Sequence, residues 1–248
     1  MSNHAILLHG WGVNHQVFAD FLPLLQPFNA QATDLMGYDG NHHEFILSQA
    51  ADIAAEKWQG KVHLFGWSLG GVVALEIAQR QPEKVATLTL CCSFARFAQA
   101  DDYAIGMPTH NWQGYPQRFS TDYSGSLKQF FALNALANTQ KMPQFNRLAD
   151  KIIAFRQPEK QVLYSSQQAV VETDLRHYLP QIQIPTLIIT GERDRVTPPI
   201  MGEYLHHNIA KSEWQNFSNS AHMPFVSEDL ACAEKLVEFW RQYSFQAA

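Results

Sequence analysis

Cysteine is scarce in this chain of 248 residues, which contains three: Cys91, Cys92 and Cys232. Three cysteines cannot all pair, and two adjacent cysteines rarely bridge each other. The sequence therefore excludes a disulfide framework of the kind that holds small secreted proteins together. We expect buried free thiols, which are typical of proteins in a reducing compartment.

Long apolar runs and an excess of basic residues are also absent. No run approaches the roughly 18 apolar residues of a transmembrane helix, and the run at residues 5–8 is too short for a signal peptide core. The net charge of −5 argues against nucleic acid as a general partner. We expect a cytoplasmic protein that binds neither membrane nor nucleic acid.

Apolar residues are plentiful, at 46% against 17% charged residues, which is enough for one large core. Short apolar runs alternate with helical patterns, as in βαβ units with a mostly parallel sheet. Strands are predicted at residues 5–9, 31–34, 62–66, 87–92, 186–190 and 213–217, with helices at 69–80 and 227–243.

The alternation stops between residues 94 and 179. Helices are predicted there at 126–138, 145–155 and 161–173, with no strand between them. A helical block inserted between two strands is most simply a lid over the functional edge of the sheet. We therefore predict an α/β fold with a core at residues 1–93 and 180–248 and a helical lid at 94–179.

The strongest motif has the form G-x-S-x-G and reads Gly66-Trp67-Ser68-Leu69-Gly70-Gly71. It follows an apolar run and opens a helix, which is the context of a nucleophile elbow rather than of an ordinary Gly-Ser turn. The sharp turn strains the backbone of Ser68 and leaves no room for side chains at positions 66 and 70. The Ser68 hydroxyl is then exposed at a helix N-terminus, where amides favour an oxyanion.

A serine hydroxyl needs a base, and hydrolases with this elbow carry the acid and then the histidine after the serine. The only histidine after residue 207 is His222, in a loop of small residues before the C-terminal helix. Asp194 follows the strand at 186–190 and is the predicted acid, which would hold the tautomer of His222. Glu192 is the rival, while Asp174 precedes the strand and is disfavoured.

Two backbone amides are needed to stabilise an oxyanion. One is predicted to be that of Leu69, directly after the nucleophile. The other is predicted to be that of Trp11, in the sequence His9-Gly10-Trp11-Gly12 that follows the first strand. We interpret His9 as a support that hydrogen-bonds this loop rather than as a base.

Together these motifs resemble the pimeloyl-acyl-carrier-protein methyl ester esterases of biotin synthesis (the BioH type), which have the α/β-hydrolase fold. The similarity spans nearly all of the chain and is thinnest in the rest of the lid. The shared segments are Leu7-Leu8-His9-Gly10-Trp11-Gly12, Gly66-Trp67-Ser68-Leu69-Gly70-Gly71, Phe130-Phe131-Ala132-Leu133-Asn134, Asp174-Leu175-Arg176 and Ala221-His222-Met223-Pro224-Phe225.

The resemblance implies a serine carboxylesterase that acts on the methyl ester of pimeloyl-acyl-carrier protein and needs no metal or cofactor. Trp11 and Leu69 would contact the ester, and Phe130, Phe131 and Asn134 would line the channel for the pimeloyl chain. Asn134 is a departure, because the family carries a longer glutamine there. The chain also begins at the position of the family's third strand, so we expect a sheet edge that needs cover.

The resemblance further implies that basic lid residues meet the acidic carrier protein. Residues 118–160 carry a charge of +4 in a chain of −5, although an ordinary solvated face would look similar. The candidates are Lys128, Lys141, Arg147 and Lys151. We expect a monomer.

Two other functions are compatible with the same residues. One is a short-chain carboxylesterase of broad specificity or a carbon–carbon bond hydrolase, since aromatic lids serve those reactions too. The other is a ligand receptor that uses the fold without catalysis, which the complete Ser-Asp-His set argues against.

Overall fold

A single parallel sheet organises the computed structural model, which describes residues 3–41 and 43–244. Its strand order is β2-β1-β3-β4-β5-β6, and every neighbouring pair runs parallel. The strands are β1 (His4–Leu8), β2 (Asn29–Thr33), β3 (Val62–Trp67), β4 (Val85–Cys91), β5 (Thr186–Gly191) and β6 (Ser212–Phe217). All six predicted strands are confirmed, with ends shifted by one or two residues.

The α-helices are α1 (Leu47–Glu56), α2 (Leu69–Arg80), α3 (Tyr115–Thr121), α4 (Tyr123–Ala135), α5 (Met142–Phe155), α6 (Lys160–Glu172), α7 (Pro199–Asn208), α8 (Pro224–Ser227) and α9 (Asp229–Ser244). Short 3-10 helices include η1 (His15–Phe18), η2 (Leu22–Leu25), η3 (Pro82–Lys84), η4 (Thr109–Asn111), η5 (Thr139–Lys141) and η6 (Arg176–Gln181). Within the described residues, no helix has the length and apolarity required to span a membrane.

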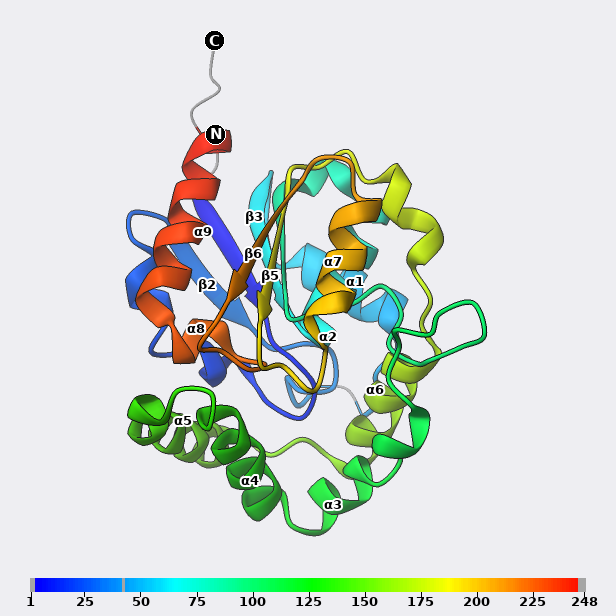
Figure 1. The fold of residues 1–248 in the computed structure, drawn as a ribbon, viewed down its shortest axis with the longest axis vertical. Coiled ribbons are helices and arrows are strands. Elements are labelled where there is room, and N and C mark those ends of the chain that lie inside the picture. The colour runs from blue at the N-terminus through cyan, green and yellow to red at the C-terminus, as the bar shows by residue number, and fades with distance from the viewer. Residues whose placement is uncertain (1–2, 42, 245–248) are drawn as a thin grey trace.

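Alternate residues of the strands belong to two apolar layers, one on each face of the sheet. Ile6 and Leu8 pack with α1, α2 and α7, whereas Ala5 and Leu7 pack with η1, α8 and α9. Figure 1 shows α1, α2 and α7 on one side of the sheet and α8 and α9 on the other. Because side chains of a strand point to alternate faces, a run that is apolar throughout fits this doubly covered sheet.

Several helical regions differ from the expectation, among them α1 and α3, which were not predicted, and the C-terminal helix. The helix α1 was not predicted, because its buried face consists of Ala50, Ala51, Ala54 and Ala55, which give no pattern of large apolar residues. The single C-terminal helix predicted at 227–243 is divided into α8 and α9, and the break lies at Glu228, whose backbone is not helical. The Glu228 carboxylate accepts hydrogen bonds from Asn219 N and Ser220 Oγ, 2.9 and 2.8 Å away.

The chain between β4 and β5 carries α3 to α6, which we call the helical insertion (residues 94–179). In Figure 1, α3, α4 and α5 lie beyond the carboxyl ends of the strands, and α6 leads back toward the sheet. Phe131 on α4 and Phe145 on α5 are fully buried in the apolar layer of η1, α8 and α9. The insertion is therefore packed onto the core by apolar contacts.

The carboxyl ends of parallel strands meet at one edge of a sheet, which is where ligands bind in such folds. The loops after β1, β3, β4, β5 and β6 all leave from that edge. The edge strand β2, by contrast, remains partly exposed along its length.

Candidate functional site

Ser68 lies in the turn that joins β3 to α2. Its backbone has φ 54° and ψ −119°, a left-handed conformation that costs free energy in a non-glycine residue and is found mainly at functional sites. The backbone segments before and after Ser68 are in close contact with each other and with β1. A Cβ on Gly66 would lie 2.3 Å from Gly70 O, and one on Gly70 would lie 2.2 Å from Leu8 O. Glycine is therefore required at both positions, as the motif predicts.

Hydrogen bonds hold this elbow in place. The Ser68 N–H donates to Cys91 O at 3.0 Å, and the Ser93 hydroxyl donates to Ser68 O at 2.8 Å. Leu69 is the first residue of α2, so its amide has no acceptor within the helix and is available to a negatively charged group. Its side chain is buried in the apolar layer beneath α2.

Asp194 and His222 lie together at the same edge of the sheet. The carboxylate Oδ2 of Asp194 is 2.8 Å from Nδ1 of His222, and both side chains are buried. Asp194 also accepts hydrogen bonds from Val196 N, Thr197 N and Thr197 Oγ1 at 2.7 to 3.0 Å. Because a carboxylate only accepts, Nδ1 of His222 carries a proton, and in the neutral ring Nε2 is then the acceptor.

Two opposing effects set the pKa of His222. Burial disfavours the charged imidazolium and lowers the pKa, but the negative charge of Asp194 and the hydrogen bond to it outweigh burial. The pKa of His222 is therefore raised above its usual value of 6.5. The imidazole is a stronger proton acceptor than a free histidine.

The backbone of His222 is held on both sides. Its N–H donates to Asn134 Oδ1 on α4 at 2.9 Å, and its carbonyl accepts from Trp67 Nε1 at 2.7 Å. Asn134 in turn donates from Nδ2 to Phe130 O at 2.9 Å. The tryptophan of the elbow and an amide of the helical insertion thus fix the position of the histidine.

The HGWG loop (residues 9–12) follows β1 at this edge. His9 is fully buried, which lowers its pKa to about 4 and keeps the ring neutral. Its Nδ1 donates to Gly10 O at 2.8 Å, and its Nε2 accepts from Leu35 N at 3.1 Å. Gly10 O belongs to the same peptide as the Trp11 N–H, and the two groups point in opposite directions in a trans peptide. His9 therefore orients the Trp11 amide, and its predicted supporting role is confirmed.

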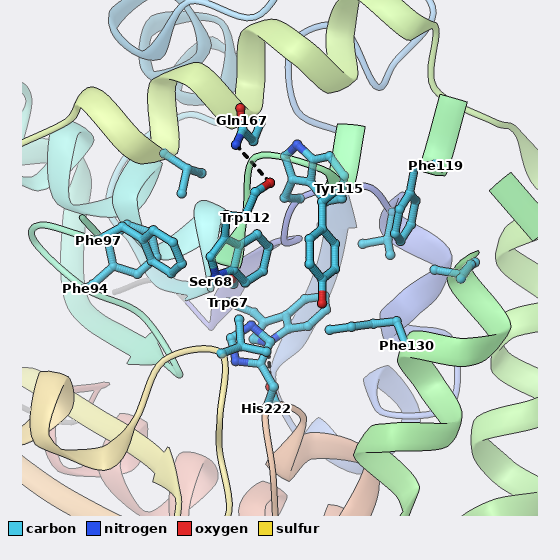
Figure 2. A pocket seen from close by; sticks show the side chains of 15 residues that line it. Trp67, Ser68, Phe94, Phe97, Trp112, Tyr115, Phe119, Phe130, Gln167 and His222 are labelled. Carbon is cyan, nitrogen blue, oxygen red and sulfur yellow. Dashed lines mark hydrogen bonds between the residues drawn. The ribbon is translucent and has the colours of Figure 1, made fainter. Parts of the chain in front are cut away.

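Ser68, Phe130 and His222 line one pocket (Figure 2). Trp11 lines it as well. About 580 Å³ of empty space, open solvent included, lies between these side chains. Apart from Ser68, His222, Tyr115 and Gln167, its walls are apolar or tryptophan side chains. The complete lining is Trp11, Val13, Trp67, Ser68, Phe94, Phe97, Trp112, Tyr115, Phe119, Leu127, Phe130, Gln167, Val170, Val196 and His222.

Two residues predicted to line this pocket do not do so. Phe131 is fully buried and packs edge-on against Phe145, with ring centroids 6.1 Å apart. Its neighbour Phe130 lines the pocket because successive residues of a helix point about 100° apart. Asn134 is buried against the backbone of His222, so its amide supports the candidate base instead of lining the channel.

The rival acids lie elsewhere. Glu192 is exposed and accepts a hydrogen bond from Asn216 Nδ2. Asp174 pairs with Arg96 at 2.6 Å and Arg176 at 2.8 Å. Arg176 and Arg96 hold the pKa of Asp174 below its usual value. Asp174 thus serves an ion-pair cluster within the helical insertion, which ties its first residues to its last.

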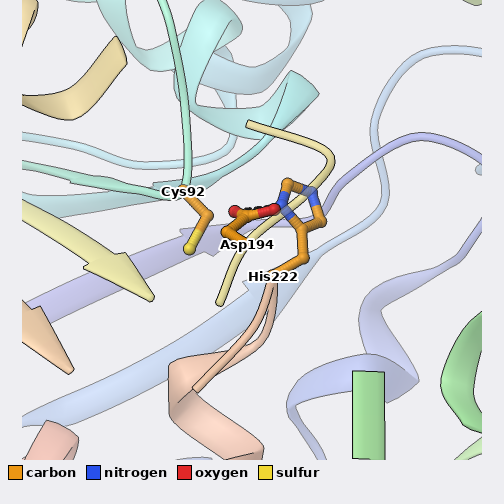
Figure 3. A group of neighbouring side chains, drawn as sticks. All are labelled: Cys92, Asp194 and His222. Atoms are coloured by element: carbon orange, nitrogen blue, oxygen red, sulfur yellow. Dashed lines mark hydrogen bonds and ion pairs between the residues drawn. The ribbon is translucent and has the colours of Figure 1, made fainter. Parts of the chain in front are cut away.

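Cys92, directly after β4, lies beside Asp194 and His222 (Figure 3). The three potential ligand atoms are within 4.8 Å of one another. The Nδ1 and Oδ2 atoms that a metal would need already bind each other at 2.8 Å, so a metal would have to replace this hydrogen bond. Burial raises the pKa of the Cys92 thiol well above its usual range, which keeps it protonated. All three cysteines are buried and free, as predicted.

Sequence reasoning missed the residues that hold the site together. Tyr38 and Tyr123 bind the HGWG loop, Thr197 binds Asp194, and Trp67 and Asn134 bind His222. A threonine three residues after a loop aspartate is a local signal that could have been found. The contacts of Trp67, Asn134, Tyr38 and Tyr123 span long sequence separations and leave no local signal.

Comparisons with known proteins agree with this geometry. A family described as "alpha/beta hydrolase fold" matches residues 3–229. A pimeloyl-acyl-carrier-protein methyl ester esterase from Neisseria meningitidis serogroup C is 34% identical over 240 residues, which cover 96% of this chain and 91% of that protein. A protein of the same name from Klebsiella pneumoniae is 31% identical over 237 residues, which cover 94% and 92%. The solved structure of an esterase from Exiguobacterium antarcticum has a TM-score of 0.84 at 26% identity, covering 96% of this chain and 91% of that one.

Replacement of Gly70 tests the elbow. In Gly70→Ala the new methyl group would meet Leu8 O at 2.2 Å, so α2 must move away from β1. We expect the free energy of unfolding to fall by about 3 kcal/mol, as in severe overpacking, measured by urea denaturation. Gly114→Ala is the control because a Cβ there meets nothing within 4 Å. Equal stability of the two variants would contradict the close contact.

Replacement of Asp194 tests the electrostatics of His222. In Asp194→Asn the charge that raises the pKa is lost, while burial still disfavours the imidazolium. We expect the pKa of His222, followed by NMR of its imidazole nitrogens, to fall below the wild-type value. Asp150→Asn removes an exposed carboxylate paired with Lys128 and should leave it unchanged. A His222 pKa that is the same in Asp194→Asn and wild type would refute the assignment.

Proposed function

Because the chain belongs to the alpha/beta-hydrolase family, and within it to the pimeloyl-acyl-carrier-protein methyl ester esterases, we propose that it hydrolyses the methyl ester of a pimeloyl group bound to acyl carrier protein. The chain is a carboxylic ester hydrolase that uses serine as its nucleophile. The observation that carries this proposal is the 2.8 Å contact between Asp194 and His222 beside the pocket that Ser68 lines. The reaction belongs to biotin synthesis, as the family resemblance implies.

The reaction proceeds through an acyl-enzyme. Ser68 Oγ attacks the ester carbonyl while His222 Nε2 accepts its proton, and Asp194 stabilises the imidazolium that forms. The amides of Trp11 and Leu69 bind the oxyanion. The tetrahedral intermediate expels methanol, which takes the proton from His222. Water then attacks the acyl-enzyme, again with His222 as base, and releases the free carboxylate and Ser68.

The apolar lining of the pocket favours binding of an acyl chain over binding of a polar substrate. Aromatic and aliphatic side chains form most of its wall (Figure 2), and methylene groups gain free energy on leaving water for such a surface. The methyl ester lies at Ser68, and the methylene chain extends along the aromatic wall. The thioester to the carrier remains outside the residues that carry out the chemistry, so only the oxygen ester is cut.

The first experiment compares a carrier-bound and a simple ester. Wild-type protein should remove one methyl group from pimeloyl-carrier methyl ester and release methanol, with the thioester intact by mass spectrometry. Ser68→Ala should lose at least about a thousandfold in rate, since removal of a triad member has effects of this order.

Cleavage of p-nitrophenyl butyrate without cleavage of the carrier-bound ester would favour a short-chain esterase of broad specificity. Retention of the rate by Ser68→Ala would contradict the assigned nucleophile. Fluorophosphonate labelling of wild type but not of Ser68→Ala would rule out a receptor without catalysis.

Basic residues of the helical insertion support binding of the acidic carrier protein. The four candidates differ in whether their charge is already paired with a carboxylate. Lys128 pairs with Asp150 at 2.9 Å, Lys141 with Asp229 at 2.6 Å and Lys151 with Asp20 at 2.5 Å. Arg147 on α5 is exposed and, within the described residues, has no ion-pair partner. Arg147 is therefore the candidate whose charge is most available to an acidic protein.

Charge reversal tests this contact. Arg147→Glu should lower kcat/KM for the carrier-bound ester about fivefold at low salt, through slower association, with a smaller effect at high salt. It should leave p-nitrophenyl butyrate hydrolysis unchanged. Lys61→Glu is the control. It introduces the same charge directly before β3, at the amino ends of the strands and away from the insertion. Equal effects of Arg147→Glu and Lys61→Glu would argue against a carrier surface on α5.

A further inference from the structure

Two tyrosines bind the peptide groups on either side of Gly12. Tyr38 Oη accepts a hydrogen bond from Gly12 N at 3.1 Å, and Tyr123 Oη donates to Gly12 O at 3.0 Å. Both tyrosines are buried, with exposed fractions of 2% and 6%. Gly12 has φ 75° and is the last residue of the HGWG loop. The loop is therefore fixed at its end by contacts that the triad does not involve.

The bond to Tyr38 continues into the helical insertion. Tyr38 Oη is 2.8 Å from Ser166 Oγ, and Ser166 donates to Val162 O at 2.5 Å. Because Ser166 gives its proton to Val162, Tyr38 donates to Ser166 while it accepts from Gly12. The chain of bonds runs from Gly12 N–H to α6, and such aligned bonds strengthen one another.

The bond to Tyr123 comes from α4, the helix that also carries Asn134. The phenol lies among apolar residues, and its ring packs edge-on against Phe119 with centroids 6.0 Å apart. Burial raises the pKa of Tyr123, so the hydroxyl remains a donor at neutral pH. The Gly12 carbonyl would lose this donor if α4 moved away, and an unpaired buried carbonyl is costly.

These hydrogen bonds affect the orientation of the Trp11 amide, which binds the oxyanion in the proposed mechanism. His9 fixes the Gly10–Trp11 peptide at one side, through Gly10 O at 2.8 Å. Tyr38 and Tyr123 fix the two peptides that follow. Trp11 itself donates from Nε1 to Leu163 O on α6 at 3.0 Å. The direction of the Trp11 N–H thus depends on the core at one end and on the insertion at the other.

We propose that Tyr123 is a positioning residue for hydrolysis: its hydroxyl holds Gly12 so that the Trp11 amide points at the oxyanion. Tyr38 performs the same task from the other side of Gly12. This role rests on the proposed ester hydrolysis but not on the identity of the acyl group. The helical insertion thereby contributes to transition-state stabilisation and not only to the shape of the pocket.

The test separates oxyanion stabilisation from substrate binding. Tyr123→Phe keeps the ring and removes the hydroxyl. With p-nitrophenyl butyrate we expect kcat to fall about tenfold with KM within twofold, because the amide matters most when the oxyanion forms. Inhibition by an alkyl boronic acid, a tetrahedral analogue, should weaken by a similar factor. Tyr38→Phe should do the same, and the double variant should lose less than the product of the two effects.

Matched controls test whether a fall in kcat could come from general loss of structure instead of loss of the Tyr123 hydrogen bond. Tyr164→Phe deletes an exposed hydroxyl on α6 of the same insertion and should leave kcat unchanged. Titration with a fluorophosphonate counts competent Ser68 sites, so that kcat is expressed per folded site. The thermal midpoint shows whether Tyr123→Phe retains its fold. If it does not, Tyr38→Phe provides the same readout from the other side of Gly12.

The outcomes are distinct. Unchanged kcat and boronate affinity in Tyr123→Phe, or a loss confined to KM, would overturn the positioning role. A loss equal to that of Tyr164→Phe would overturn it as well. Hydrolysis by Ser68→Ala at the wild-type rate would refute the proposed function and the role that rests on it. Failure of the carrier-bound ester alone would change the substrate and leave the role of Tyr123 standing.

Discussion

The contact between the backbones of β1 and α2 is the constraint on which the site depends. Gly70 lies so close to Leu8 O that no other residue fits without movement, and this approach sets where α2 begins. Ser68 is held in its strained conformation between two elements that cannot separate. The same contact brings the first amides of α2 beside the HGWG loop. The positions of the proposed nucleophile and of the two predicted oxyanion donors therefore all depend on this one backbone contact.

The proposed catalytic groups come from the core, but residues of the helical insertion hold several of them in place. Asn134 on α4 binds the N–H of His222, and Tyr123 at the start of α4 binds the carbonyl of Gly12. Asn14, just after the loop, donates from Nδ2 to Ile152 O on α5 and to Arg156 O at 3.1 and 3.0 Å. A cover that only excluded water would need no such bonds. The insertion is part of the framework that orders the site.

Local patterns were sufficient to predict much of the fold and to select the candidate site residues that the structure brings together. The elbow glycines, the position of Asp194 after a strand and the order of acid and histidine all follow from short segments of sequence. Long-range packing was not predictable in the same way. Phe131 and Asn134 share a motif with Phe130, yet only Phe130 faces the pocket. Their directions depend on the rotation of α4 against the core, which a motif does not specify. The alanine face of α1 likewise has a helical role without an amphipathic pattern of large residues.

The spacing along α4 has a consequence for how this protein can diverge. Tyr123 and Asn134 are eleven positions apart, about three turns of helix, so they lie on one face roughly 16 Å apart. Insertion or deletion of one residue between them would rotate one partner by about 100° relative to the other. Either the loop or the histidine would then lose its contact. Changes of length in this region should therefore accumulate in the segments that flank α4, while the helix itself varies by substitution alone.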